Sequence, residues 1–237
     1  MLRSPMRELD NSCGGLLPLM APLEPAPAAR DDRRDIWLTR GDVRTAALAL
    51  AETISSERKR LVFLLCGNSC ETLIGLLAAA AAGHATALID PSLAKDKLSA
   101  LIEAYQPDLF LSTPDIGKNL DREALGCGGW RFHEWGAGVV EWAARDSRTG
   151  SIDINPASQV LLSTSGTTGS QKYVRLARDA IVANAKQIAQ ALAIDDRSVG
   201  IAHLPLHYSY GLSVVTSHLV AGGRVCFIND SITLPGF

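Results

Sequence analysis

The part of the chain with the clearest chemical character is a run of small, mostly hydroxyl-bearing residues that ends in a lysine, Ser163-Thr164-Ser165-Gly166-Thr167-Thr168-Gly169-Ser170-Gln171-Lys172. Glycines let a backbone turn tightly and bring its N–H groups close to an anion. The hydroxyls add further donors and Lys172 adds a positive charge. The pattern therefore predicts a loop that holds the phosphates of a nucleotide.

This run differs from the common P-loop, which has glycine directly before the lysine and serine or threonine after it. Here Gln171 precedes Lys172 and Tyr173 follows it. Clusters of serine, threonine and glycine are also typical of polar surface hairpins. Composition alone leaves both interpretations open.

The pattern Thr164-Ser165-Gly166-Thr167-Thr168-Gly169-x-x-Lys172 resembles the signature phosphate loop of the adenylate-forming superfamily. That superfamily includes acyl-CoA synthetases, adenylation domains of peptide synthetases, and luciferases. Order, spacing and the preceding buried strand all agree. The family usually has proline before the lysine and glycine after it, so Gln171 and Tyr173 are departures that bear on the loop's flexibility more than on its ligand.

Two further segments resemble the same family. The first, Leu204-Pro205-Leu206-His207-Tyr208-Ser209-Tyr210-Gly211-Leu212, is similar to the stretch that borders the family's acyl pocket. Aligned from Gly211, the family's usual histidine falls at Tyr208, with His207 one place earlier, so the polar role is assigned to this pair. The second segment, Ala82–Pro91, resembles the turn after the first helix of the sheet and is interpreted as architecture.

The resemblance implies a two-step reaction in which a small carboxylic acid and ATP give an acyl-adenylate and pyrophosphate, and a thiol then takes the acyl group. The thiol would belong to CoA or to the phosphopantetheine of an acyl carrier protein. Mg²⁺ is implied with the ATP, because charge develops on the phosphates. The implied phosphate ligands are Thr164, Ser165, Gly166, Thr167, Thr168, Gly169 and Lys172, and the implied acyl-pocket residues are His207, Tyr208 and Gly211.

The resemblance covers about residues 36–237, the first part of a typical family member. The family's Thr-Glu pair, its ribose-binding aspartate, its hinge and its C-terminal lid domain with the catalytic lysine would all follow Phe237. We therefore expect an irregular N-terminal arm over residues 1–35 and an incomplete N-terminal AMP-binding domain over residues 36–237. The isolated chain is expected to be catalytically silent.

Two functions other than that of an adenylate-forming enzyme remain open. One is a non-catalytic module that binds a nucleotide or phosphate. The other is an assembly module, because a sheet that is cut after Ile228 leaves apolar edges for a partner segment or a second copy to cover. A Rossmann oxidoreductase is poorly supported, since no G-x-G-x-x-G follows the run Leu61–Cys66.

The elements that must position the loop follow from hydrophobic periodicity. The predicted strands are Leu61–Cys66, Ala85–Ile89, Asp108–Leu111, Gln159–Ser163, Tyr173–Leu176, Val199–Ala202 and Arg224–Ile228. The predicted helices begin after caps at Asp42, Ser69 and Ser92, and two more cover Asp179–Ala193 and Ser209–Ala221. Strands that alternate with helices predict an α/β fold of largely parallel sheets flanked by helices. Residues 112–157 are interpreted as a loop-rich bridge with short strands or a helix.

The composition of the chain limits the kinds of partner and compartment that it fits. The chain has 237 residues, a formal net charge of −2 and no basic stripe, which argues against nucleic acid. Its five irregularly spaced cysteines favour a reducing cytoplasm over a disulfide framework, and they form no zinc pattern. No apolar run reaches the length needed to span a membrane.

The remaining chemistry-bearing residues are interpreted as structural or exposed. His84, His133, His203 and His218 show no metal-ligand spacing. The Ser-x-x-Lys patterns at residues 56–59 and 92–95 lack the motifs that accompany a serine hydrolase and are attributed to chance.

Overall fold

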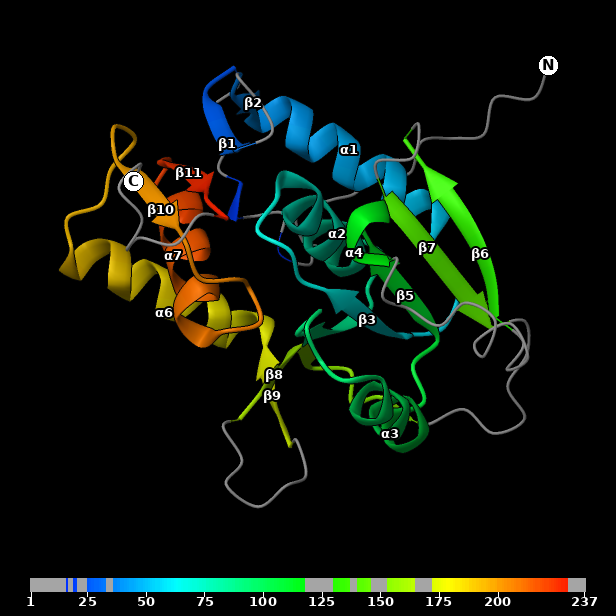
Figure 1. Cartoon of the computed structure of the whole chain (residues 1–237). Coiled ribbons are helices and arrows are strands. Elements are labelled where there is room, and N and C mark those ends of the chain that lie inside the picture. The colour runs from blue at the N-terminus through cyan, green and yellow to red at the C-terminus, as the bar shows by residue number, and fades with distance from the viewer. Residues whose placement is uncertain are drawn as a thin grey trace.

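The computed structural model describes residues 16, 19–20, 25–32, 36–117, 130–136, 140–145, 153–164 and 172–229. Two layers of strands and several helices are arranged as Figure 1 shows. The strands are β1 (Pro27–Asp31), β2 (Leu38–Thr39), β3 (Leu61–Leu65), β4 (Ala85–Ile89), β5 (Leu109–Ser112), β6 (Trp130–Trp135), β7 (Val140–Arg145), β8 (Ser158–Ser163), β9 (Tyr173–Ala177), β10 (Val199–Ala202) and β11 (Arg224–Phe227). The helices are α1 (Arg40–Thr53), α2 (Cys70–Ala81), α3 (Lys95–Tyr105), α4 (Pro114–Gly117), α6 (Arg178–Ala191) and α7 (Ser209–Val220).

The strands form two sheets. The larger has seven strands in the order β6-β7-β5-β3-β4-β8-β9, and the smaller has four in the order β10-β11-β1-β2. Strands β5, β3, β4 and β8 run parallel, as do β10, β11 and β1. Antiparallel strands lie only at the margins of the described sheets, where β9 pairs with β8, β7 with β5 and β2 with β1. The fold is thus the predicted α/β arrangement of largely parallel sheets flanked by helices.

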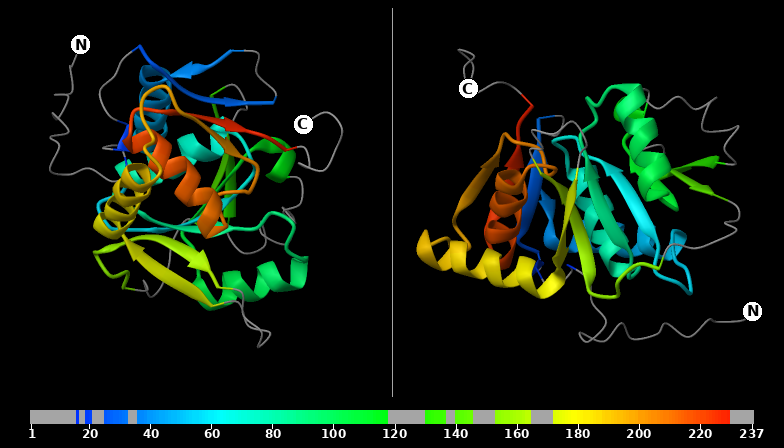
Figure 2. Two further views of the ribbon diagram at one scale, coloured as in Figure 1. Left: turned by 90° about the vertical axis from the view of Figure 1, so that its left-hand side faces the viewer. Right: turned by 90° about the horizontal axis from the view of Figure 1, so that it is seen from below.

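The centre of the larger sheet forms because its strands are continuously apolar. Every residue of β3 and β4 is buried, as a strand covered on both faces requires. Helices α1 and α2 contribute to the cluster on one face, which includes Val62 and Leu64. Helix α3 contributes to the cluster on the other face, with Phe63, Leu65 and the edge-to-face pair of Phe63 and Phe110. Figure 2 shows α3 on the side of the molecule away from α6 and α7.

Two helix starts differ from prediction. Helix α1 is capped by Thr39, whose hydroxyl accepts from the Asp42 backbone N–H, while the Asp42 carboxylate accepts from the Thr39 N–H. Asp42 is therefore the third helical residue of a capping box and not the cap itself. Helix α3 begins at Lys95 without a side-chain cap, because the Ser92 hydroxyl donates to Asp90 Oδ1 in the turn after β4.

The predicted arm also differs from the structure. Residues 27–31, expected to be irregular, form β1 and lie between β11 and β2 in the smaller sheet. The prolines around this segment concealed the strand, because proline is depleted from sheets except at strand starts and edges. Pro27 is the first residue of β1, where its missing N–H is tolerated.

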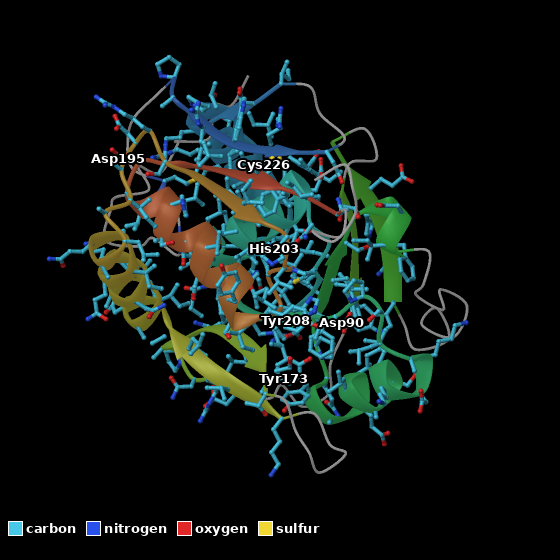
Figure 3. The ribbon with its side chains drawn as sticks, turned by 60° about the vertical axis from the view of Figure 1, so that its left-hand side comes forward. Asp90, Tyr173, Asp195, His203, Tyr208 and Cys226 are labelled. Carbon is cyan, nitrogen blue, oxygen red and sulfur yellow. The ribbon has the colours of Figure 1, made fainter. Side chains whose placement is uncertain are left out.

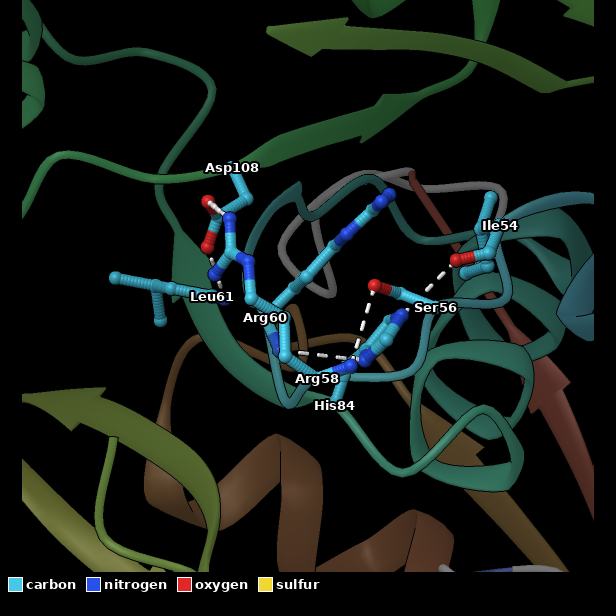
Figure 4. Close-up of polar contacts among 7 residues, drawn as sticks. All are labelled: Ile54, Ser56, Arg58, Arg60, Leu61, His84 and Asp108. Atoms are coloured by element: carbon cyan, nitrogen blue, oxygen red, sulfur yellow. Dashed lines mark hydrogen bonds and ion pairs between the residues drawn. The ribbon is translucent and has the colours of Figure 1, made fainter. Parts of the chain in front are cut away.

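A polar cluster closes the amino end of β3 (Figure 4). Asp108, which is 4% exposed, accepts from the Arg58 guanidinium at 2.6 Å and from the Leu61 N–H at 3.0 Å. His84 is buried, with Nδ1 facing the Arg60 N–H at 3.4 Å and Nε2 facing the Ile54 carbonyl at 2.9 Å. These bonds fix where the strand begins. Among the helices of the described residues, none is long and apolar enough to cross a membrane.

Candidate functional site

The base of the predicted phosphate loop is closed by two hydrogen bonds to one carbonyl. The Thr164 N–H donates to the Lys172 carbonyl at 2.9 Å, and the Thr164 hydroxyl donates to the same oxygen at 3.2 Å. Ser163 and Tyr173 pair directly below, as the last residue of β8 and the first of β9. Both Thr164 and the Lys172 side chain are exposed. Of the predicted phosphate ligands, Ser165, Gly166, Thr167, Thr168 and Gly169 lie outside the described residues.

The closed loop begins at the carboxyl end of β8, which runs parallel to β4. In open α/β sheets, ligands bind in the crevice outside the carboxyl ends of the strands. Thr164 and Lys172 therefore hold the two ends of the loop where a phosphate site is expected, with the Lys172 ammonium available to an anion.

The second predicted segment connects β10 to α7, so it belongs to the smaller sheet. His207 is buried, whereas Tyr208 is 49% exposed and lies just before α7. The two rings contact each other with centroids 4.3 Å apart. Gly211 is buried in the first turn of α7, and a Cβ there would lie 2.4 Å from the carbonyl oxygens of Leu204 and Pro205. Only glycine allows the helix to approach this connection so closely.

His207 is a buried ring whose environment favours its neutral form. Burial lowers its pKa, and the charge of Asp90 raises it to a smaller extent. The Nε2 atom lies 3.9 Å from Asp90 Oδ2, and neither ring nitrogen has a hydrogen-bond partner among the described residues. A neutral imidazole has one donor and one acceptor, so His207 can bind or orient a polar group without carrying charge.

Asp90 is a site residue that sequence reasoning missed. Its segment is predicted as architecture, but the turn after β4 brings its carboxylate beside His207 from the other sheet. Asp90 Oδ1 accepts from the N–H and the hydroxyl of Ser92, which leaves Oδ2 directed to the histidine. The only sequence signal was its place at the carboxyl end of a buried strand.

Tyr173 also belongs to this neighbourhood. Burial raises the pKa of its phenol, and the Asp90 charge contributes in the same direction. Burial likewise raises the pKa of the Cys66 thiol at the end of β3, so Cys66 is not a thiolate nucleophile. In Figure 3, Asp90 lies beside Tyr208, with Tyr173 below them and Asp195 far away. The turn after β4 thus lies close both to the start of β9 and to the β10–α7 connection.

The other histidines take structural positions or remain outside this cluster, as predicted for them. His84 is held in the polar cluster below β3, and His218 Nδ1 lies 2.8 Å from the Val214 carbonyl within its own helix. The His203 ring contacts the Tyr210 ring, with centroids 6.1 Å apart. Among the described residues, no three histidine, cysteine or acidic side chains gather as metal ligands.

Hydrogen bonds tie the two sheets together beside the site. The Asn68 amide donates to the carbonyls of His203 and Ile228 at 3.0 and 2.9 Å. The Asp31 carboxylate, at the end of β1, accepts from the Cys70 N–H at the start of α2. An acidic side chain at a helix N-terminus is also favourable electrostatically. Side chains near β3, α2 and β1 therefore link the larger sheet and its helix α2 to the smaller sheet.

Known proteins resemble this chain over most of its length. The chain is 24% identical over 213 residues to a linear gramicidin synthase from Brevibacillus parabrevis, a match that covers 86% of this chain and 3% of that protein. It is 21% identical over 186 residues to the D-alanine–D-alanyl carrier protein ligase of Listeria monocytogenes serotype 4b (strain CLIP80459), covering 78% of this chain and 36% of the ligase. The chain thus spans about a third or less of these relatives.

Solved structures share the fold. ATP-bound MatB from Rhodopseudomonas palustris superposes with a TM-score of 0.71 at 21% identity, over 90% of this chain and 44% of MatB. A complex of VinN with 3-methylaspartate gives a TM-score of 0.66 at 16% identity, over 91% of this chain and 62% of VinN. A family profile described as AMP-binding enzyme matches residues 23–236. With nine-tenths of its length inside that match, the chain belongs to the family of AMP-binding enzymes.

Proposed function

We propose that this chain is the N-terminal part of an acid–thiol ligase that activates a small carboxylic acid with ATP as an acyl-adenylate and passes the acyl group to a thiol. Residues 36–237 would form an incomplete AMP-binding domain, and the lid domain with the catalytic lysine would lie outside this chain. The observation that carries the proposal is the loop closed by Thr164 and Lys172 at the carboxyl end of β8.

The loop would bind the β- and γ-phosphates. In the proposal, Thr164 closes the base of the loop and Ser165, Thr167 and Thr168 offer hydroxyls to the phosphates. Gly166 and Gly169 let the backbone N–H groups approach, and Lys172 supplies the positive charge. ATP supplies the leaving pyrophosphate, and Mg²⁺ would neutralise part of the phosphate charge. The family membership supports ATP as the nucleotide.

The acyl pocket would lie beside the β10–α7 connection. Gly211 keeps α7 close to that connection, and Tyr208 presents a half-exposed ring. His207, a buried ring whose pKa is lowered and whose nitrogens have no hydrogen-bond partner among the described residues, is suited to a polar group without charge. These residues would hold and orient the acid next to the loop.

The thiol acceptor is proposed as CoA or the phosphopantetheine of a carrier protein. The second of these is favoured by one relative, whose name describes a ligase that acts on D-alanine and a D-alanyl carrier protein. The compartment is proposed as the cytoplasm, in keeping with the buried cysteines Cys66, Cys70 and Cys226, which form no disulfide within the described part of the chain.

The test is nucleotide binding by this chain. We expect ATP with Mg²⁺ to bind measurably by calorimetry, and Lys172→Ala to weaken binding by about tenfold or more, because one charge-assisted hydrogen bond contributes about 1.5–3 kcal/mol. Lys186→Ala, an exposed lysine on α6, is the matched control and should bind as the unchanged chain does. Equal affinities for both variants would remove the loop from the proposal.

Activity separates this proposal from a non-catalytic nucleotide-binding module. The chain alone is expected to show no carboxylate-dependent exchange between ATP and pyrophosphate, and exchange should appear when the chain is extended by the remaining family domains. Exchange catalysed by the isolated chain would contradict the expectation that this chain alone is inactive. ATP binding without exchange in the extended protein would favour the non-catalytic module.

A further inference from the structure

A cavity lies beside the end of α3, between that helix and the strands β8 and β9. Its volume is about 330 Å³, at the lower end of small-molecule sites, so its ligand must be small. Leu61 and Leu161 form its buried floor, and Tyr105 and Tyr173 form an aromatic wall. The two rings meet edge to face, with centroids 5.4 Å apart.

This cavity is distinct from the proposed acyl pocket. It opens on the face of the larger sheet that α3 covers, whereas His207 and Tyr208 come from the smaller sheet. Tyr173 stands between the two regions, because its ring lines the cavity while its hydroxyl is buried beyond the reach of solvent. A ligand in the cavity would therefore meet the face or edge of the ring and not its hydroxyl.

The rim of the cavity carries two opposite charges. Arg175, on β9, and Asp153, in the segment before β8, both line the opening and are exposed. Neither has an ion-pair partner within the described part of the chain. A guanidinium suits a carboxylate, and a carboxylate suits an ammonium group.

We propose that this cavity binds a free amino acid with an apolar, ring-bearing side chain. The side chain would lie against Tyr105, Tyr173 and the leucine floor, where aromatic groups pack edge to face. The carboxylate would pair with Arg175 and the ammonium group with Asp153. A monoanion such as an aryl carboxylate uses only one of these charges, and a phosphate ester would be repelled by the Asp153 carboxylate.

The experiment is an NMR titration of this chain with L-phenylalanine. We expect saturable binding with a Kd on the order of millimolar, as suits a small ligand and exposed charges. Amide shifts should concentrate at Leu161 and Tyr105. Because Lys172 does not line the cavity, Lys172→Ala should leave this binding unchanged, so failure of the nucleotide site and failure of this site are distinguishable.

Two comparisons decide the ligand class. 3-Phenylpropionate lacks the ammonium group and 2-phenylethylamine lacks the carboxylate, and each should bind about fivefold more weakly, the upper range for one exposed ion pair. Arg175→Gln and Asp153→Asn should each have a similar effect on L-phenylalanine. Lys186→Gln and Asp196→Asn, exposed residues that do not line the cavity, are the matched controls and should have none.

The outcomes that overturn the proposal are equally definite. Absence of saturation overturns the site. Equal affinity for L-phenylalanine and 3-phenylpropionate overturns the proposal that the ligand is an amino acid. So does an Asp153→Asn variant whose affinity for L-phenylalanine is unchanged. Shifts confined to residues away from the cavity overturn its location. The analogue series uses the unchanged chain, so it decides the question even where a variant fails to fold.

Discussion

His84 shows how a single buried ring can make stability depend on pH. Its pKa is lowered from the ordinary value of 6.5, mainly by burial, although the Ile54 carbonyl raises it in part. The neutral ring fits its two partners, whereas a protonated ring would place a charge in a site without a compensating anion at hydrogen-bond distance among the described residues. Proton uptake by His84 therefore favours the unfolded chain.

We expect the free energy of unfolding to fall as pH drops below 6.5. His84 takes up a proton in the unfolded chain at a higher pH than in the native chain, because its native pKa is lowered. His84→Gln should make this decline shallower between pH 6.5 and 5. Urea unfolding at several pH values measures it, with exposed His133→Gln as the control. Some decline should remain in the variant, because the pKa of His207 is also lowered. An identical slope in variant and unchanged chain would contradict this account.

At the scale of elements, the start of α7 depends on one missing side chain. A Cβ at Gly211 would overlap two backbone carbonyl oxygens, which cannot move as a flexible side chain can. Gly211→Ala should therefore lower the free energy of unfolding by about 1–3 kcal/mol, the usual cost of overpacking. It should also displace the His207 ring, seen as shifted ring resonances in NMR spectra.

The matched control for this prediction is Ser213→Ala, a half-buried position in the same helix. It should change stability by a few tenths of a kcal/mol and leave the His207 resonances in place. If Gly211→Ala proves as mild as Ser213→Ala, the close approach of α7 to the Pro205 carbonyl is not a constraint on the site.

Prediction of elements from sequence succeeded where the pattern is local. Val199–Ala202 was predicted with the bounds that β10 has, because four small or apolar residues stand between polar turns. The strand β1 was missed because its pairing with β11 joins residues 196 positions apart, as Arg30 and Cys226 do. The cap at Ser92 failed because the Asp90 carboxylate competes for its hydroxyl. The hydrophobic periodicity of the sequence carries no information about such competing side-chain hydrogen bonds.

The candidate site residues also divide into those that a local sequence pattern predicts and those that only the tertiary structure brings into place. The loop and the His207/Tyr208 pair were predicted because each is a short run whose order resembles a motif of the adenylate-forming superfamily. Asp90 was not, because it meets His207 only when the two sheets are brought together in the fold. Contacts of this kind depend on tertiary structure, and the residue type alone fits an ordinary turn.

At the scale of the whole molecule, β10 is the exposed edge of the smaller sheet. Val199 and Ile201 are 42% and 43% exposed, and their strand has a neighbour on one side only among the described residues. An edge with apolar side chains is a template for pairing with another chain. In the proposed full-length protein, polypeptide outside this chain would cover it.

We therefore expect the isolated chain to self-associate as its concentration rises, and Ile201→Lys to reduce this, because a charged side chain on an edge strand opposes pairing. Sedimentation velocity over a concentration series measures the change. Leu192→Lys is the matched control, since Leu192 is 69% exposed but follows a helix and borders no sheet edge. Equal effects of the two variants would point to general hydrophobic association and not to β10.

The hydrogen bonds that Asn68 and Asp31 make between the two sheets have a consequence for how the protein unfolds locally. Because each joins the larger sheet or its helix to the smaller sheet, neither sheet can loosen without releasing a partner in the other. Backbone amides in β11 and at the start of α2 should then exchange with deuterium at one shared slow rate. Asn68→Ala should split this cooperative unit, and β11 should exchange first.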